Sequence, residues 1–387
     1  MRILHLLHAS AGWEQRAGLT QLRERLRAPD HDHILAAMDD AAIERLNSSV
    51  PPQLSSPSDS ARPILRAPRR LGIPALAGAR VAAICRREQI DMIHAWGVDA
   101  AAAARAGAAD GPPVVVTLFD PGLSERDIRV LRTVADRPNV AFACSAERVQ
   151  RRIVEGGIPI ERCAIVRPGV DFGALRQVDR EALRAELGLP ESGMTVLTPD
   201  PPSNAAGHAA AIWSILMRRF LDPASRIIVP GVSKEVPELR RLIECSASSD
   251  VGVFTESRYR FEDLLAVADY LVIGGDGEIS TTALVWAMAS STPIIAPASY
   301  AVTEVLSHDV NAILFKHPGS INRAGAMICA LYDATENLPR LTEAARGQAF
   351  EVCSIRRFAD QYRQLYENTS AGRTAATDIT DPALDTK

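Results

Sequence analysis

The sequence has few aromatic residues, few cysteines and no long apolar run. Phe, Trp and Tyr together make up 5% of its 387 residues, and no two of its six cysteines form a CxxC pair. Zinc sites usually need closely spaced cysteines, so we expect no metal. Most of the cysteines lie in apolar runs, which indicates buried thiols in a reducing compartment, the cytoplasm. No stretch reaches the roughly 20 apolar residues of a membrane span.

A basic excess is also absent, because 43 Lys and Arg residues stand against 47 Asp and Glu residues. A nucleic-acid-binding chain would need such an excess, so we expect no nucleic-acid partner. The opening MRILHLLHASAG is too short and too rich in histidine for a signal peptide and predicts a first strand. The hydrophobic content of 47% predicts a packed core, and the length suffices for two domains.

Short apolar runs alternate with longer helical stretches along the whole chain. Runs that are apolar on both faces and separated by helices predict parallel sheets covered on both sides. There are two sets of about six, which favour two doubly wound α/β domains. The expected strands lie at 2–8, 33–38, 92–96, 113–119, 140–144 and 163–168 in the first set, and at 194–199, 226–231, 251–255, 270–275, 293–297 and 312–315 in the second.

A short polar helix that ends at Gly188, followed by Pro190, marks the predicted domain boundary. We expect an N-terminal domain over 1–175, a C-terminal domain over 176–350, a helix at 351–367 and a disordered tail at 368–387. In open parallel sheets, ligands bind beyond the carboxyl ends of the strands, so the loops that follow the strands are the candidate sites.

Three such loops lie in the first domain. Gly12 lies in a strand-to-helix turn where backbone amides could approach a ligand, although an ordinary turn is the favoured interpretation. His94 ends a strand, and a structural histidine is the favoured interpretation there. Asp120 follows another strand and could either orient a substrate hydroxyl or cap the next helix.

A fourth loop, in the second domain, carries Glu278, followed by Ser280, Thr281 and Thr282 at a predicted helix start. A helix N-terminus carries partial positive charge suited to a phosphate, and its hydroxyl side chains can bind an anion or cap the helix. Glu278 could accept hydrogen bonds from sugar hydroxyls.

Several of these stretches resemble GT-B glycosyltransferases of the family 4 type. The similar stretches are Ser145–Asp171, which ends in a GVD turn, LRAELGLP, ADYLVIGGDGEISTTALVWAMASSTPIIAP, VTEVL and the C-terminal AARGQAFEVCSIRRFADQYRQLY. The resemblance covers Met1 to about Glu367. It implies two Rossmann-like domains facing a central cleft, a nucleotide-sugar donor, transfer with retention and no metal or other cofactor. It also implies that the C-terminal helix returns to the first domain.

Six positions depart from the family pattern. Glu278 matches the first Glu of its E-x7-E motif, but Trp286 occupies the place of the second, which binds the donor ribose. Pro201 and Ala206 replace the Arg and Lys that bind the diphosphate, while Gly207 is kept. Phe119 replaces a histidine that is usually catalytic. Gly274 and Gly275 stand where the family has Pro-Ser. Loss of both cations could weaken donor binding about 100-fold or more.

Two functions therefore stay open. The chain could be a divergent retaining glycosyltransferase that acts on a glycan or a lipid-linked acceptor. It could instead be an inactive relative that binds a glycan, a nucleotide or a protein, with Trp286 stacking on a ligand or filling the vacated volume. A sugar-nucleotide 2-epimerase shares the architecture but fits the signature less well. The basic stretch Ala61–Gly72 could touch a membrane, although a solvated loop is the favoured interpretation.

Overall fold

A computed structural model describes residues 1–8, 13–26, 30–37, 62–63, 74–107, 111–119, 122–173, 175, 178–199, 205–231, 236–246, 248–256, 259–275, 281–316, 323–333, 337–373 and 375. The chain divides into two compact units. Unit 1 comprises Met1–Gly169 together with Ile355–Lys387, and unit 2 comprises Val170–Ser354. The structure thus divides the chain at Gly169, a little before the boundary expected at residue 175.

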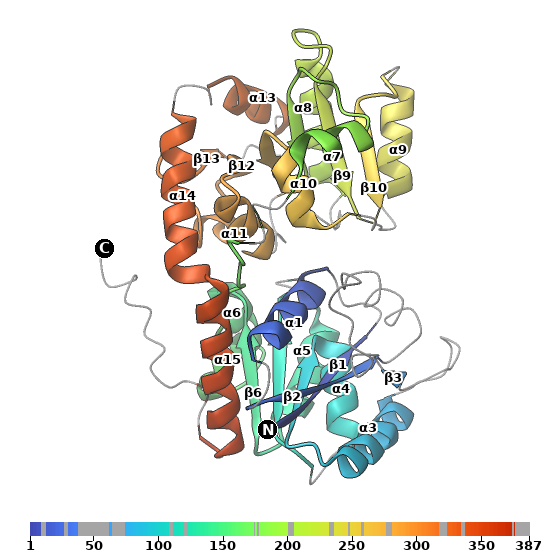
Figure 1. The fold of residues 1–387 in the computed structure, drawn as a ribbon, viewed down its shortest axis with the longest axis vertical. Coiled ribbons are helices and arrows are strands. Elements are labelled where there is room, and N and C mark those ends of the chain that lie inside the picture. The colour runs from blue at the N-terminus through green and yellow to red at the C-terminus, as the bar shows by residue number, and fades with distance from the viewer. Residues whose placement is uncertain are drawn as a thin grey trace. The chain divides into compact units, whose positions relative to one another are not determined.

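Unit 1 contains a parallel sheet of seven strands in the order β3-β2-β1-β4-β5-β6-β7 (Figure 1). All neighbours are parallel, and the reversal of strand order beside β1 is typical of a doubly wound fold. The strands are β1 (Arg2–Leu7), β2 (Asp32–Ala37), β3 (Arg62–Pro63), β4 (Met92–Trp96), β5 (Val114–Leu118), β6 (Val140–Cys144) and β7 (Cys163–Ile165).

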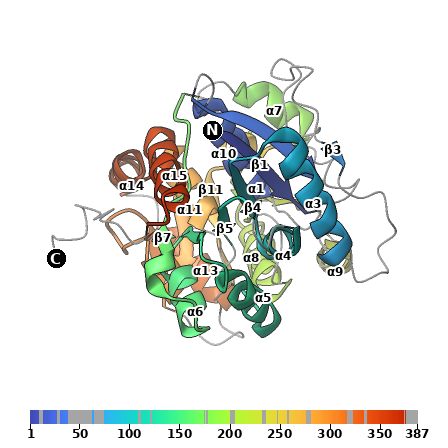
Figure 2. The same ribbon diagram turned by 90° about the horizontal axis from the view of Figure 1, so that it is seen from below.

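The helices of unit 1 cover both faces of this sheet. They are α1 (Trp13–Arg25), α3 (Pro74–Glu88), α4 (Val98–Gly107), α5 (Glu125–Ala135), α6 (Glu147–Glu155) and α15 (Ile355–Ser370), with a 3-10 turn at Ile160–Arg162. One core joins the sheet to α3, α4, α5 and α6, and α3, α4 and α5 lie side by side in that order (Figure 2). A second core joins the opposite face to α1 and α15. Alternate strand residues supply the two cores, as the two-residue period of a strand requires.

Unit 2 contains six parallel strands in the order β10-β9-β8-β11-β12-β13. They are β8 (Thr195–Leu197), β9 (Arg226–Pro230), β10 (Gly252–Glu256), β11 (Tyr270–Val272), β12 (Ile294–Pro297) and β13 (Ile313–Phe315). The helices are α7 (Arg180–Glu186), α8 (Ala205–Arg218), α9 (Val236–Cys245), α10 (Phe261–Val267), α11 (Thr281–Ala289), α12 (Tyr300–Thr303), α13 (Arg323–Asp333) and α14 (Leu338–Cys353). A core of buried residues joins one sheet face to α8, α9 and α13.

All twelve expected strands are present, and the fold class predicted from the sequence is confirmed. The two-residue β3 was not expected, because it lies at the end of a Ser- and Pro-rich stretch, residues 47–63, whose composition predicts a loop. The tail was predicted to begin at residue 368, which is wrong, since α15 continues to Ser370 with Asn368 and Thr369 buried. Four cysteines are buried as expected, whereas Cys245 and Cys329 are exposed. Among the described residues, no helix is long and apolar enough to cross a membrane.

Candidate functional site

The order of strands in unit 2 reverses between β8 and β11. These two strands are neighbours, yet the chain leaves β8 toward β9 on one side and reaches β11 on the other. In open α/β sheets, the crevice beyond the carboxyl ends at such a point is where ligands bind. The residues that follow β8 and β11, and the first turn of α8, therefore form the candidate ligand edge of unit 2.

Two glycines bring the backbone of α8 against the end of β11. A Cβ built on Gly207 would lie 2.5 Å from the backbone nitrogen of Gly275, and one built on Gly274 would lie 2.0 Å from the carbonyl oxygen of Gly207. No side chain fits at either distance, so both positions require glycine. The kept Gly207 thus has a packing partner in Gly274, one of the two residues that replace the Pro-Ser of the family.

The start of α8 is also fixed to the end of β8. The ring nitrogen Nε2 of His208 lies 3.2 Å from the carbonyl oxygen of Pro199, which can only accept, so this nitrogen carries the proton. His208 is 8% exposed. Because helix N-termini carry partial positive charge, this arrangement presents a fixed positive end at the switch point.

The helix α11 begins at Thr281, as the sequence predicted, and all nine of its residues are buried. Thr281 and Thr282 are 1% and 2% exposed, and Trp286 is 4% exposed. An indole buried to this extent packs in the interior of unit 2 instead of presenting its face to solvent. The structure therefore favours the volume-filling interpretation of Trp286 over the stacking one.

A carboxylate that no sequence motif marks, that of Glu262, lies in the first turn of α10. Burial raises the pKa of Glu262 to about 7, while the guanidinium of Arg260, 3.5 Å away, opposes this increase. Arg260 is also held by Asp263, 2.8 Å from it. A carboxyl group that titrates near neutrality is a candidate for binding or proton transfer. Glu262 is recognised by its burial beside charged neighbours, which the sequence pattern does not reveal.

In unit 1 the corresponding reversal lies between β1 and β4. His8 follows β1 and Asp99 lies in the first turn of α4, and His8 Nδ1 is 3.3 Å from Asp99 Oδ2. The His8 side chain is 33% exposed, and that of Asp99 is 56% exposed. A carboxylate beside one ring nitrogen fixes the orientation of an imidazole, an arrangement suited to binding a hydroxyl group. No local sequence pattern reveals this pair, because its members are far apart in the chain.

His94 and Phe119, by contrast, lie inside unit 1. His94 is fully buried, with Nδ1 at 2.6 Å from the Tyr366 hydroxyl and Nε2 at 2.7 Å from Thr117 Oγ1. Both ring nitrogens are thus engaged by side chains, which favours the structural interpretation of His94 over a ligand contact. Phe119 is 2% exposed and stacks on Trp96 with ring centroids 6.2 Å apart.

Of the other predicted positions, those that the structure describes lie in unit 2. Gly207, Thr281, Thr282 and Trp286 all belong to unit 2, as does Ala206 in the first turn of α8. The remaining predicted positions lie outside the described residues: Gly12, Asp120, Pro201, Glu278 and Ser280.

Sequence comparison matches residues 17–173 to the family described as Glycosyltransferase Family 4. The D-inositol 3-phosphate glycosyltransferase 1 of Catenulispora acidiphila is 26% identical over 218 residues, which are 54% of this chain and 52% of that protein. The MMP alpha-(1→4)-mannosyltransferase of Mycolicibacterium hassiacum is 26% identical over 258 residues, 66% of this chain and 59% of that protein. The chain therefore spans little more than half the length of these relatives.

Solved structures share the fold across almost the whole chain. The Anabaena protein HepE, in complex with UDP and glucose, superposes with a TM-score of 0.76 at 18% identity, covering 95% of this chain and all of that one. With its two doubly wound units, the chain has the GT-B fold, and part of its sequence is similar to glycosyltransferases of family 4.

Proposed function

We propose that this protein is a glycosyltransferase that uses a nucleotide-sugar donor and retains the anomeric configuration. The observation that carries this proposal is the backbone contact between Gly207 and Gly274, which fixes the positive end of α8 at the switch point of unit 2. A diphosphate suits that end of a helix. Complexes of HepE with UDP and with UDP-glucose support the choice of donor class.

The donor side of this proposal comprises Gly207, Thr281 and Thr282 of unit 2, together with Glu278 and Ser280 beside them in the sequence. Glu278 would accept hydrogen bonds from the sugar. On unit 1, the His8–Asp99 pair would bind a hydroxyl of the acceptor, a glycan or a lipid-linked sugar. Gly12 and Asp120 follow β1 and β5 in the sequence and belong to the same proposed acceptor side.

Isothermal titration calorimetry of the purified chain against UDP, GDP, ADP and their sugars tests the donor proposal. We expect micromolar affinity for one nucleotide and its sugar. Glu278→Gln should weaken binding of the nucleotide sugar at least about 10-fold, the value of one charge-assisted hydrogen bond. Glu244→Gln, an exposed carboxylate on α9, is the matched control and should leave the affinity unchanged. An NMR assignment of the product anomer then tests retention.

A second candidate is an inactive relative that binds a glycan or a protein partner. The burial of Trp286 and Phe119, at positions where the family has polar groups, favours it. The same titration separates the two functions. If no nucleotide binds at millimolar concentration, the donor proposal is abandoned and the inactive relative is the remaining candidate.

A further inference from the structure

The outer face of α8 and the turn that follows it carry four large apolar side chains exposed to solvent. Trp213 is 47% exposed, Met217 50%, Phe220 82% and Leu221 68%. Their spacing of four, three and one residues places them on one side of the helical path. The opposite side is already part of the unit 2 core, since Ala211, Ile212 and Ile215 are fully buried. We call these four exposed residues the α8 stripe.

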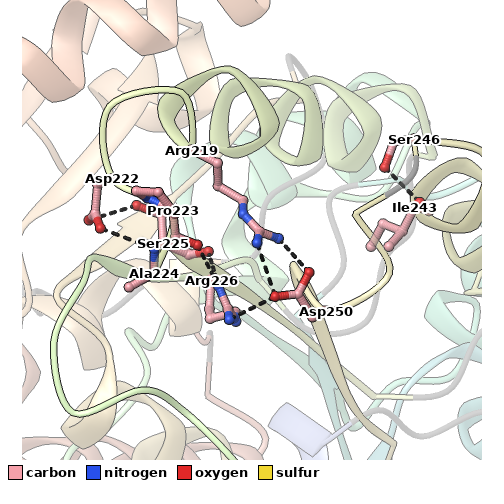
Figure 3. A network of polar contacts seen from close by, with 9 residues as sticks. All are labelled: Arg219, Asp222, Pro223, Ala224, Ser225, Arg226, Ile243, Ser246 and Asp250. Carbon is pink, nitrogen blue, oxygen red and sulfur yellow. Dashed lines mark hydrogen bonds and ion pairs between the residues drawn. The ribbon is translucent and has the colours of Figure 1, made fainter.

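The turn that presents Phe220 and Leu221 is held by a network of polar contacts (Figure 3). Arg219 donates two hydrogen bonds to Asp250, at 2.8 and 3.0 Å, and Arg226 lies 2.8 Å from the same carboxylate. Asp222 accepts hydrogen bonds from the Met194 and Ala224 backbone amides and from the Ser225 hydroxyl. A rigid turn loses little conformational entropy on binding, so its apolar groups are well suited to a specific contact.

Charge argues against a membrane as the occupant of this surface. Helices that lie on anionic membranes combine an apolar face with available Lys and Arg side chains. Here Arg219 and Arg226 are both engaged by Asp250, whose carboxylate balances one of their two positive charges, and these two arginines hold the pKa of Asp250 below its ordinary value. Because both arginines are held in ion pairs and point their charge at Asp250, the α8 stripe suits an apolar protein surface better than an anionic membrane.

The area of the α8 stripe indicates which protein binds there. A large side chain has about 150–250 Å² of surface. The exposed parts of the four side chains therefore present roughly 500 Å² of apolar surface together. Two copies of the stripe would together bury on the order of 1,000 Å², about the minimum for a specific interface. A two-fold axis places the same patch on both sides, so an apolar stripe is complementary to itself. We propose that the α8 stripe is the interface of a homodimer of this chain.

Sedimentation equilibrium of the full chain between about 1 and 100 μM tests this proposal. We expect a monomer–dimer equilibrium for the wild type. Phe220→Asp should raise the dimer dissociation constant at least 100-fold, because each interface would bury two unpaired carboxylates. Leu221→Asp should act in the same direction. The control is Phe350→Asp on α14, since Phe350 is also exposed, at 63%, and lies in the same unit.

Several outcomes would overturn the proposal: a wild type that stays monomeric over this range, a dimer that tolerates both stripe variants, or a dimer that Phe350→Asp dissociates equally well. Far-UV circular dichroism confirms that each variant folds. Co-sedimentation with phosphatidylglycerol vesicles supplies a further readout. A monomeric wild type that binds the vesicles, and loses binding with Phe220→Asp, would identify a membrane as the occupant. None of these readouts depends on donor binding, so the dimer can fail while the proposed function stands.

Discussion

Two tryptophans of unit 2 lie in opposite surroundings. Trp286 is 4% exposed in the middle of α11, whereas Trp213 is 47% exposed on α8. Replacing a buried aromatic side chain by Ala removes its transfer free energy and leaves a cavity. We therefore expect Trp286→Ala to lower the free energy of unfolding of unit 2 by about 3–5 kcal/mol. Trp213→Ala should change it by less than about 1 kcal/mol at submicromolar concentration, where the proposed dimer is dissociated.

Hydrogen exchange in peptides from β11 and β12, followed through urea unfolding, measures this difference within unit 2 alone. Equal small effects of the two substitutions would mean that the Trp286 indole does not pack in the interior. If calorimetry shows that Trp286→Ala binds a nucleotide more tightly than the wild type does, the indole occupies volume that a donor would otherwise fill.

The two glycines at the ligand edge allow a second test at the scale of a residue. A Cβ at position 274 would meet the carbonyl oxygen of Gly207 at 2.0 Å, and backbone atoms cannot move aside as a side chain does. We expect Gly274→Ala to cost about 3 kcal/mol of unit 2 stability through this overlap. Gly347→Ala in the interior of α14 meets nothing within 4 Å and should stabilise by about 0.5–1 kcal/mol.

The same hydrogen-exchange experiment compares these two variants. If Gly274→Ala proves as harmless as Gly347→Ala, then α8 and β11 are not in backbone contact, and the observation that carries the proposed function is lost.

At the scale of elements, three histidines lie on the face of the unit 1 sheet that α1 and α15 cover. Trp96 Nε1 donates to His5 Nδ1 at 3.1 Å, so His5 carries its proton on Nε2, which lies 2.8 Å from His33 Nδ1. His33 then donates from Nε2 to the carbonyl oxygen of Leu26, 2.8 Å away. The bonds accepted by His5 Nδ1 and His33 Nδ1 require neutral imidazoles, whereas the bond from His33 to Leu26 persists when the ring is protonated.

This chain makes unit 1 sensitive to acid. Burial lowers the pKa of His33 from 6.5 to about 4, with a smaller decrease from Arg23, and burial also holds the pKa of His5 and His94 well below 6.5. The hydrogen bond to Leu26 and the charge of Asp32 oppose the decrease for His33, while Arg23 and His31 add to it. The folded state binds fewer protons than the unfolded state, so stability is complete above pH 6.5 and is lost as the pH falls toward 4.

For His33 alone, the loss amounts to about 3 kcal/mol. Hydrogen exchange in peptides from β1 and β4, compared with His33→Gln at each pH, measures it. The variant should flatten the pH dependence between 6.5 and 4, whereas His308→Gln, at an exposed position in unit 2, should not alter it. If His33→Gln leaves the dependence of unit 1 stability on pH unchanged, the acid sensitivity belongs to other groups.

The elements themselves were largely predictable, and their polar contacts were not. Buried parallel strands are local runs of Val, Ile, Leu and Ala, so β4 and β6 were predicted to the residue. The partner of His94 is Tyr366, 272 positions later, which no local pattern indicates. Gly207 was recognised from the family motif, but the reason it must be glycine depends on Gly274 in another element.

At the scale of the whole molecule, the two units differ in how the chain builds them. Unit 2 is one continuous segment, whereas unit 1 needs Ile355–Lys387 in addition to Met1–Gly169. The second segment supplies α15, in which Phe358, Tyr362, Leu365 and Tyr366 are at most 1% exposed and pack in the core that α1 shares. Tyr362 also lies 2.6 Å from Thr117 Oγ1. Without α15, one face of the unit 1 sheet would lose much of its apolar cover.

A chain truncated after Ser354 should therefore lose the fold of unit 1 and keep that of unit 2. Removal of four fully buried aliphatic and aromatic side chains costs on the order of 10 kcal/mol, which matches the whole stability of an ordinary domain. Hydrogen exchange should show β1 and β4 unprotected and β8 and β11 still protected. Truncation after Ala375 retains all of α15 and is the matched control. Protection of β1 and β4 in the shorter chain would mean that Met1–Gly169 folds alone, and that α15 adds to unit 1 without being required for it.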